Sequence, residues 1–114
     1  MTFQPGSDLS QEEVTDRVDS AIADNDVVLF IKGNRLMPQC GYSKRALELV
    51  SQYEEEFETV DTLEALEEYR TALNEHSGWE TIPQTYVGGE FVGGSDILAE
   101  LDERGELEAT LTGE

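Results

Sequence analysis

The residue of this chain best suited to chemistry is its single cysteine, Cys40. It follows a loop stiffened by Pro38 and directly precedes a segment with helical spacing. A lone cysteine is more often a small buried hydrophobic residue, but this one does not lie within an apolar stripe. The amides and dipole of a helix N-terminus stabilise a thiolate, and Lys32, Lys44 and Arg45 add positive charge. We therefore predict that Cys40 acts as a nucleophile or a metal ligand.

A single thiolate limits the chemistry that the chain can do alone. A dithiol redox centre needs a resolving cysteine, and the residue three positions after Cys40 is Ser43. The remaining options are exchange with a thiol from outside the chain, or ligation of a metal or cluster that outside ligands complete. Both options need a second thiol from solution, and the residue types alone leave both open.

Two further segments have groups suited to a ligand. Pro83 precedes a predicted strand, where a plain loop proline is an equally good interpretation. Gly94, Ser95 and Asp96 form first of all a tight turn that caps a helix. The amides and carboxylate of this turn would also suit a ligand with an ammonium and a carboxylate group. His76 stands alone in a polar stretch and is given no role.

Hydrophobic spacing and turn signals predict the elements that position these residues. The first is a helix from the N-cap Ser10 to about Ala23, where a capping box precedes apolar residues at helical spacing. Next come a strand at 27–31 covered on both faces, a helix from Gly41 or Tyr42 that fades over 54–56, and a strand at 57–60. A third helix is capped by Asp61 or Thr62 and ends near Gly78. A hairpin of 84–87 and 90–92 around Gly88-Gly89 follows, and a last helix is capped by Ser95 or Asp96 and ends at Gly105.

The order of these elements predicts an α/β fold. An early strand–helix–strand unit implies parallel pairing through a right-handed crossover, and the hairpin adds antiparallel strands. The result is a four-stranded mixed sheet with helices on both faces, which is the thioredoxin-like arrangement. Residues 106–114 are predicted to be acidic chain without a further element. We expect one domain at residues 10–111, after a flexible leader at 1–9 and before an acidic tail at 112–114.

The net charge of −19 divides into two unequal parts. Residues 27–47 contain no acid and carry a charge of +4, so the rest of the chain carries −23. A surface with this much negative charge repels phosphate backbones and anionic lipids. We therefore expect no nucleic-acid or membrane partner. No apolar run approaches the ~20 residues of a membrane span and no secretory signal is visible. With one cysteine and no internal disulfide, we expect a cytoplasmic protein.

Together these residues resemble the monothiol glutaredoxin family. The resemblance covers residues 14–111 and rests on the order and spacing of four motifs: Lys32-Gly33, Pro38-Gln39-Cys40-Gly41-Tyr42-Ser43, Trp79-Glu80-Thr81-Ile82-Pro83-Gln84 and Gly93-Gly94-Ser95-Asp96. The loop between Lys32 and Cys40 has the longer length that marks the monothiol branch. The resemblance implies that Cys40 is the active-site thiolate and a metal ligand.

The resemblance also implies a binding site for glutathione. Lys32 and Arg70 match positions that hold the carboxylate at its glycine end. Thr81, Ile82 and a cis Pro83 match the segment whose backbone pairs with the cysteine of the tripeptide. Gly94, Ser95 and Asp96 match the turn that binds its γ-glutamyl end. Gly41 and Tyr42 match positions beside the thiolate.

In this family two protomers and two glutathiones hold a 2Fe–2S cluster, which supplies the four thiolates such a cluster normally takes. The resemblance therefore implies a homodimer when the cluster is bound, a monomer otherwise, and transfer of the cluster to apo iron–sulfur client proteins. One alternative is a thiol–disulfide oxidoreductase, at most a weak one, that uses Cys40 to remove small-thiol adducts from proteins. Another is a non-catalytic binding module.

Three features depart from the family pattern. Tyr42 stands where the usual motif has phenylalanine, and Ser95 stands where a second cysteine is frequent. The acid-rich, lysine-poor composition suits concentrated salt, where screening removes self-repulsion. It indicates a halophilic archaeal source, in which γ-glutamylcysteine would take the place of glutathione as the small thiol.

Overall fold

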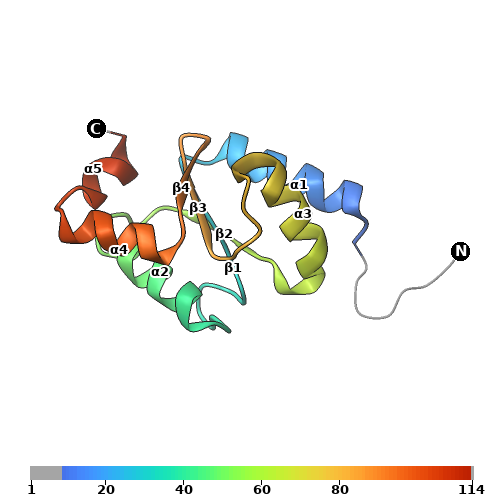
Figure 1. Ribbon diagram of the computed structural model, residues 1–114, viewed down its shortest axis with the longest axis horizontal. Helices are drawn as coiled ribbons and strands as arrows, with labels where there is room; N and C mark the ends of the chain where they lie inside the picture. Colours follow the sequence, from blue (N-terminus) through green and yellow to red (C-terminus); the bar gives the residue numbers. More distant parts are fainter. Residues whose placement is uncertain (1–8, 114) are drawn as a thin grey trace, which may run out of the picture.

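The computed structural model describes residues 9–113 and contains one sheet with helices on both of its faces (Figure 1). Its elements are α1 (Gln11–Asp24), β1 (Val27–Ile31), α2 (Gly41–Ser51), β2 (Glu58–Asp61), a 3₁₀ turn (Leu63–Ala65), α3 (Leu66–Ser77), β3 (Gln84–Val87), β4 (Glu90–Gly93), α4 (Ser95–Glu103) and α5 (Leu107–Thr112). Most of the expected leader, residues 1–8, and the last tail residue, 114, lie outside the described residues. Within the described part, no helix has both the length and the apolar character needed to cross a membrane.

The sheet confirms the predicted topology. Its strand order is β2-β1-β3-β4, with β1 parallel to β2 and antiparallel to β3, and β3 antiparallel to β4. The crossover between the parallel strands contains α2, so the segment between β1 and α2 leaves the sheet at its centre. Cys40 is the last residue of that segment.

Two apolar layers hold the helices on the sheet, and β1 contributes to both. Val28 and Phe30 pack in the layer beneath α1 and α3, whereas Leu29 and Ile31 pack in the layer beneath α2, α4 and α5. All five residues of β1 are buried. This two-sided burial is the physical reason for the continuous apolar run at 27–31.

The helix starts agree with the sequence only in part. Ser10 caps α1 as predicted, accepting from the Glu13 N–H at 3.1 Å. The side chain of Thr62 does not cap a helix, because its hydroxyl donates to the Ile31 carbonyl. The residues that follow it form a 3₁₀ turn, and α3 begins only after that turn. The Asp61 carboxylate accepts from the Leu63 N–H at 2.9 Å instead.

The C-terminal segment corrects the sequence analysis most clearly. Residues 107–112 form α5, where we expected acidic chain without a further element. Leu107 and Leu111 are buried against the α2 and α4 layer, with exposed fractions of 1% and 3%. Two apolar residues at helical spacing therefore extend the core in an otherwise acidic stretch.

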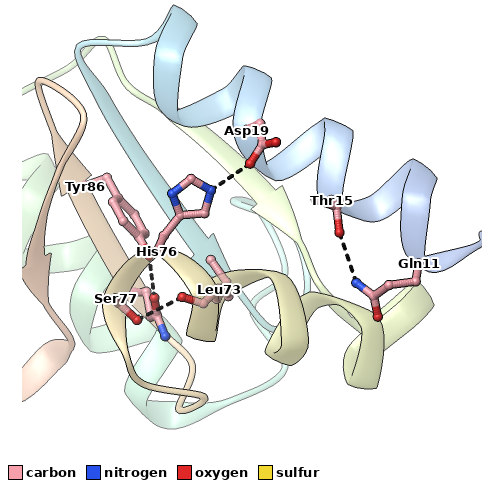
Figure 2. Close-up of polar contacts among 8 residues, drawn as sticks. Gln11, Thr15, Asp19, Leu73, His76, Ser77 and Tyr86 are labelled. Atoms are coloured by element: carbon pink, nitrogen blue, oxygen red, sulfur yellow. Dashed lines mark hydrogen bonds and ion pairs between the residues drawn. The ribbon is translucent and has the colours of Figure 1, made fainter.

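His76 connects α3 to α1, the two helices on the opposite face of the sheet from α2 (Figure 2). Its Nε2 lies 2.7 Å from the Asp19 carboxylate on α1, and its ring meets the Tyr86 ring edge-on at 6.3 Å. The neighbouring Ser77 hydroxyl donates to the Leu73 carbonyl within α3 at 3.0 Å. The contacts of His76 are thus structural ones between α1, α3 and β3.

Candidate functional site

Cys40 occupies the N-cap of α2, as the sequence predicted. Its backbone is extended, its carbonyl accepts from the Lys44 N–H at 2.9 Å, and its side chain is half-buried. Burial acts to raise the pKa of the thiol, but the N–H groups of Ser43 and Tyr42, the Ser43 hydroxyl and the charge of Lys32 act the other way. The net pKa lies below the ordinary value for cysteine, so the thiolate forms more readily than that of an unperturbed cysteine.

Ser43 is a residue of the candidate site that the sequence analysis missed. We noted it only as the residue that stands where a resolving cysteine would be. In the structure Ser43 is fully buried, and its hydroxyl accepts from the Lys32 N–H at 3.0 Å while it hydrogen-bonds to the Cys40 sulfur. A hydroxyl that accepts one bond and donates another is oriented, so it presents its proton to the thiolate. Its place in the first turn of a helix capped by cysteine was the available signal.

The loop between Lys32 and Cys40 is closed at its base. The Gln39 N–H donates to the Lys32 carbonyl at 2.8 Å, and Gly33 forms an isolated bridge with Pro38. Gly33 has a φ of +92°, and a Cβ there would lie 2.6 Å from the Met37 carbonyl oxygen. Only glycine fits this conformation and this close approach. The loop therefore holds Lys32, at the end of β1, beside the start of α2.

The segment before β3 has the expected cis peptide bond between Ile82 and Pro83. Both residues are buried, whereas Thr81 is exposed. The buried amide of Gln84 shapes this segment: it donates to the carbonyls of Trp79 and Thr81 at 2.8 and 3.0 Å. The backbone of 79–81 is thereby fixed by a side chain to which the sequence analysis gave no role.

The turn before α4 lies against this segment. A Cβ on Gly94 would lie 3.1 Å from the Pro83 carbonyl oxygen, so the two backbones are in contact. Gly94 itself is the N-cap of α4, and no side-chain cap is present, so the prediction of Ser95 or Asp96 as the cap is wrong. Ser95 is buried in the first turn, whereas Asp96 is exposed there. The structure thus brings the backbones of Gly94 and Pro83 into contact.

Arg70 is the predicted site residue that forms an ion pair within its own helix. It lies on α3, and its guanidinium donates to Glu67 at 2.6 Å. This ion pair lies within one helix and is part-exposed, so it is weak and open to exchange with another carboxylate.

The positive charges around Cys40 differ from those elsewhere. Arg17, Arg70 and Arg104, which lie outside residues 27–47, each form an ion pair with a glutamate. Within the described residues, the four cations inside that segment have no carboxylate oxygen within 4.0 Å; they are Lys32, Arg35, Lys44 and Arg45. The segment around the thiol therefore keeps its +4 charge without an ion-pair partner.

Two surface hollows of about 560 and 540 Å³ lie away from Cys40. One is lined by residues of α1 and β2, and the other by the segments that lead into β1 and β2. Acidic residues line both, among them Asp24 and Glu58, and neither contains a predicted site residue. An anionic thiol would be repelled there, which leaves the region around Cys40 as the candidate site.

Comparison with known proteins assigns the family. The sequence profile of the glutaredoxin family matches residues 27–92, a range that contains Cys40 and Pro83. A protein from Synechocystis, described as an uncharacterized monothiol glutaredoxin, is 48% identical over 99 residues, which cover 87% of this chain and 92% of that one. This chain belongs to the monothiol glutaredoxin family.

Solved glutaredoxins share the architecture of this glutaredoxin. Reduced apo GrxS14 from poplar is 37% identical with a TM-score of 0.76, over 90% of this chain and 93% of that one. A buckwheat glutaredoxin–glutathione complex is 25% identical with a TM-score of 0.74, over 90% and 91%. The thioredoxin-like fold expected from the element order is thus confirmed. In this glutaredoxin Tyr42 has 66% of its surface exposed beside the thiol, and Ser95 is buried.

Proposed function

We propose that this glutaredoxin carries a 2Fe–2S cluster between two copies of the chain and passes it to apo iron–sulfur proteins. The observation that carries the proposal is a lone cysteine with a lowered pKa at a helix N-terminus, with a serine where a resolving cysteine would stand. The cluster is cargo here, and Cys40 is the ligand that each copy would give. The cytoplasm, where thiols stay reduced, is the location that we propose.

The donor set of the chain supports a shared site. Among residues 9–113, no group of three or more His, Cys, Asp or Glu side chains could hold a metal ion. A 2Fe–2S cluster takes four thiolates, and each chain has one to give. Two copies of Cys40 and two small thiols complete the set. The lowered pKa of Cys40 helps because ligation requires the thiolate.

The small thiol would lie across the neighbouring segments. We propose that the backbone of Thr81, Ile82 and Pro83 pairs with its peptide-like part, that Gly94, Ser95 and Asp96 receive its γ-glutamyl end, and that Gly41 and Tyr42 border its sulfur. The contact between Gly94 and Pro83 supports one continuous groove. The buckwheat glutaredoxin solved with glutathione supports glutathione as one candidate thiol.

Lys32 and Arg70 would receive a carboxylate at the glycine end of glutathione. Arg70 must then exchange Glu67 for the ligand, which their exposed ion pair permits. γ-Glutamylcysteine lacks this glycine, so it would leave Arg70 with Glu67. The two thiols can therefore be distinguished by Arg70→Gln, which should weaken the assembly formed with glutathione and leave that formed with γ-glutamylcysteine unchanged.

Anaerobic reconstitution with iron, sulfide and one of the two thiols tests the proposal. We expect a coloured dimer, detected by visible absorption and by mass in solution, and a colourless monomer for Cys40→Ser. His76→Gln, on the face away from Cys40, is the matched control and should give wild-type colour. A colourless wild-type protein with both thiols, or equal colour in Cys40→Ser, would overturn the proposal.

A second candidate function rests on the same lowered pKa. The Cys40 thiolate would attack the small-thiol sulfur of a mixed disulfide and release the protein thiol. A second small thiol would then reduce the Cys40 adduct and leave as a disulfide. We expect slow turnover on a glutathionylated protein, because the chain has no resolving cysteine. Fast turnover together with failed reconstitution would favour this function over cluster transfer.

A further inference from the structure

The loop before Cys40 and the first turn of α2 present large apolar side chains to solvent. Leu36 is 91% exposed, Met37 65% and Tyr42 66%, and all lie within four residues of Cys40. Exposing such side chains together is unusual on a chain whose apolar content is 38%. Their position means that anything reaching the thiol passes over them.

The loop holds these side chains outward in a fixed arrangement. The Asn34 carboxamide oxygen accepts from the N–H groups of Leu36 and Met37 at 2.9 and 2.8 Å. At the other side, Arg35 donates to the carbonyls of Glu55 and Phe57 and lies 3.8 Å from the centre of the Phe57 ring. A surface that is already ordered loses little entropy when a partner binds, which favours docking.

The charge around these side chains has the opposite sign to the rest of the chain. Lys44 and Arg45 are exposed in the first turns of α2 and have no carboxylate partner among the described residues, in contrast to Arg104 directly after α4, which pairs with Glu100. The three arginines outside residues 27–47 show that this chain readily pairs its cations. The unpaired cations beside Cys40 are therefore available to a partner.

We propose that the surface around Cys40 is a docking surface for an acidic protein segment. The surface consists of the side chains of Leu36, Met37, Tyr42, Lys44 and Arg45. The segment carries an apolar side chain close to the sulfur or metal site that it presents to Cys40. The carboxylates of the segment meet Lys44 and Arg45, and its apolar side chain covers Leu36 and Met37. The inference rests on the proposed function in one respect: the partner must exchange a thiol or a cluster at Cys40.

Thiol exchange tests the docking surface without a cluster or a small thiol. The probes are synthetic peptides whose cysteine is joined in a disulfide to thionitrobenzoate, with glutamate or lysine as the charged residue and leucine or serine beside the cysteine. The Cys40 thiolate bonds to the peptide sulfur, the disulfide bond breaks, and coloured thionitrobenzoate leaves with the electron pair. No other oxidant or reductant is needed.

The net charge and the local charge predict opposite results. A net charge of −19 would repel the glutamate peptides and favour the lysine peptides. We expect the reverse at low salt: the glutamate–leucine peptide should react about tenfold faster than its lysine counterpart, within the range of electrostatic steering. Molar salt should remove this difference and leave the preference for leucine over serine.

Matched variants locate the effect. Arg45→Glu should lower the preference for glutamate peptides several-fold, whereas Arg104→Glu changes the net charge equally at the far end of α4 and should not. Leu36→Ser should remove the leucine preference without changing the fold, since the side chain is 91% exposed. Faster reaction of the lysine peptides, or an equal effect of the two arginine variants, would overturn the inference. Failed cluster reconstitution alone would not.

Discussion

Replacing Thr85 with valine should make this glutaredoxin more stable. Thr85 lies on β3 opposite Leu29 of β1, and residues directly opposite one another point to the same face of a sheet. It therefore faces the apolar layer beneath α2 and α4 and is fully buried. Among the described residues, its Oγ1 is the buried side-chain polar atom without a hydrogen-bond partner.

The size of the effect follows from the hydroxyl alone. A buried hydroxyl without a partner costs about 1–3 kcal/mol, and valine has the same branched shape, so the change opens no cavity. We expect the free energy of unfolding to rise by about 1–2 kcal/mol, since part of the cost is relieved by relaxation. For a chain of this length, that corresponds to an increase in Tm of roughly 4–8 °C.

Thr62→Val is the matched control. Thr62 is also fully buried, but its hydroxyl donates to the Ile31 carbonyl at 2.9 Å. That carbonyl also accepts from the Thr62 N–H, so it keeps a partner in the variant. The control should therefore lose only the net value of one hydrogen bond, about 1 kcal/mol.

Urea unfolding followed by far-UV circular dichroism measures both variants on one scale. The two midpoints should move in opposite directions with the slope unchanged. A Thr85→Val protein no more stable than wild type would show that the hydroxyl is satisfied in the folded state and would contradict the prediction.

Three further predictions concern the thiol, the loop and the charge. Ser43→Ala should move the pH profile of Cys40 alkylation upward, because one hydrogen bond that lowers the thiol pKa is lost; an unchanged profile would contradict this. Gly33→Ala should destabilise the fold by more than the ~1–2 kcal/mol of a left-handed residue. The comparison is Gly105→Ala, which shares the positive φ but has open space at its Cβ; equal losses by thermal unfolding would contradict the proposed close approach. Stability should rise between low and molar salt, because screening weakens the self-repulsion of a −19 chain, and a flat Tm would count against the hypothesis of a salt-adapted protein.

Local patterns predicted the parts of the fold that depend on neighbours in sequence. The strand at 27–31 and the hairpin around Gly88 and Gly89 follow from an apolar run and from two residues that adopt positive φ. The helix α5 was missed because six residues cannot form a stable helix on their own. Leu107 and Leu111 become buried only when α2 and α4 are already in place.

The site divides in the same way. Cys40 at the start of a helix could be predicted, because the loop, the proline and the helical spacing are adjacent in sequence. The position of Ser43 in the first turn was visible in the sequence, but its hydrogen bond with the Lys32 N–H was not, because that bond requires the chain eleven residues earlier to turn back toward the helix. Arg70 shows the converse: its residue type matched a role, but its contact in the structure is with Glu67 on its own helix.

The two electrostatic effects at Cys40 have different ranges, and salt should separate them. In molar salt the Debye length is about 3 Å, so interactions between charges across solvent are screened beyond that distance. The hydrogen bonds from Ser43 and Tyr42 act by direct contact with the thiol, where no salt ion intervenes, so the lowered pKa of Cys40 should persist in brine. The attraction of Lys44 and Arg45 for an acidic partner acts across solvent and should not. In concentrated salt, then, the thiolate keeps its reactivity while partner choice falls to the exposed side chains of Leu36 and Met37, whose apolar contacts are not weakened by screening.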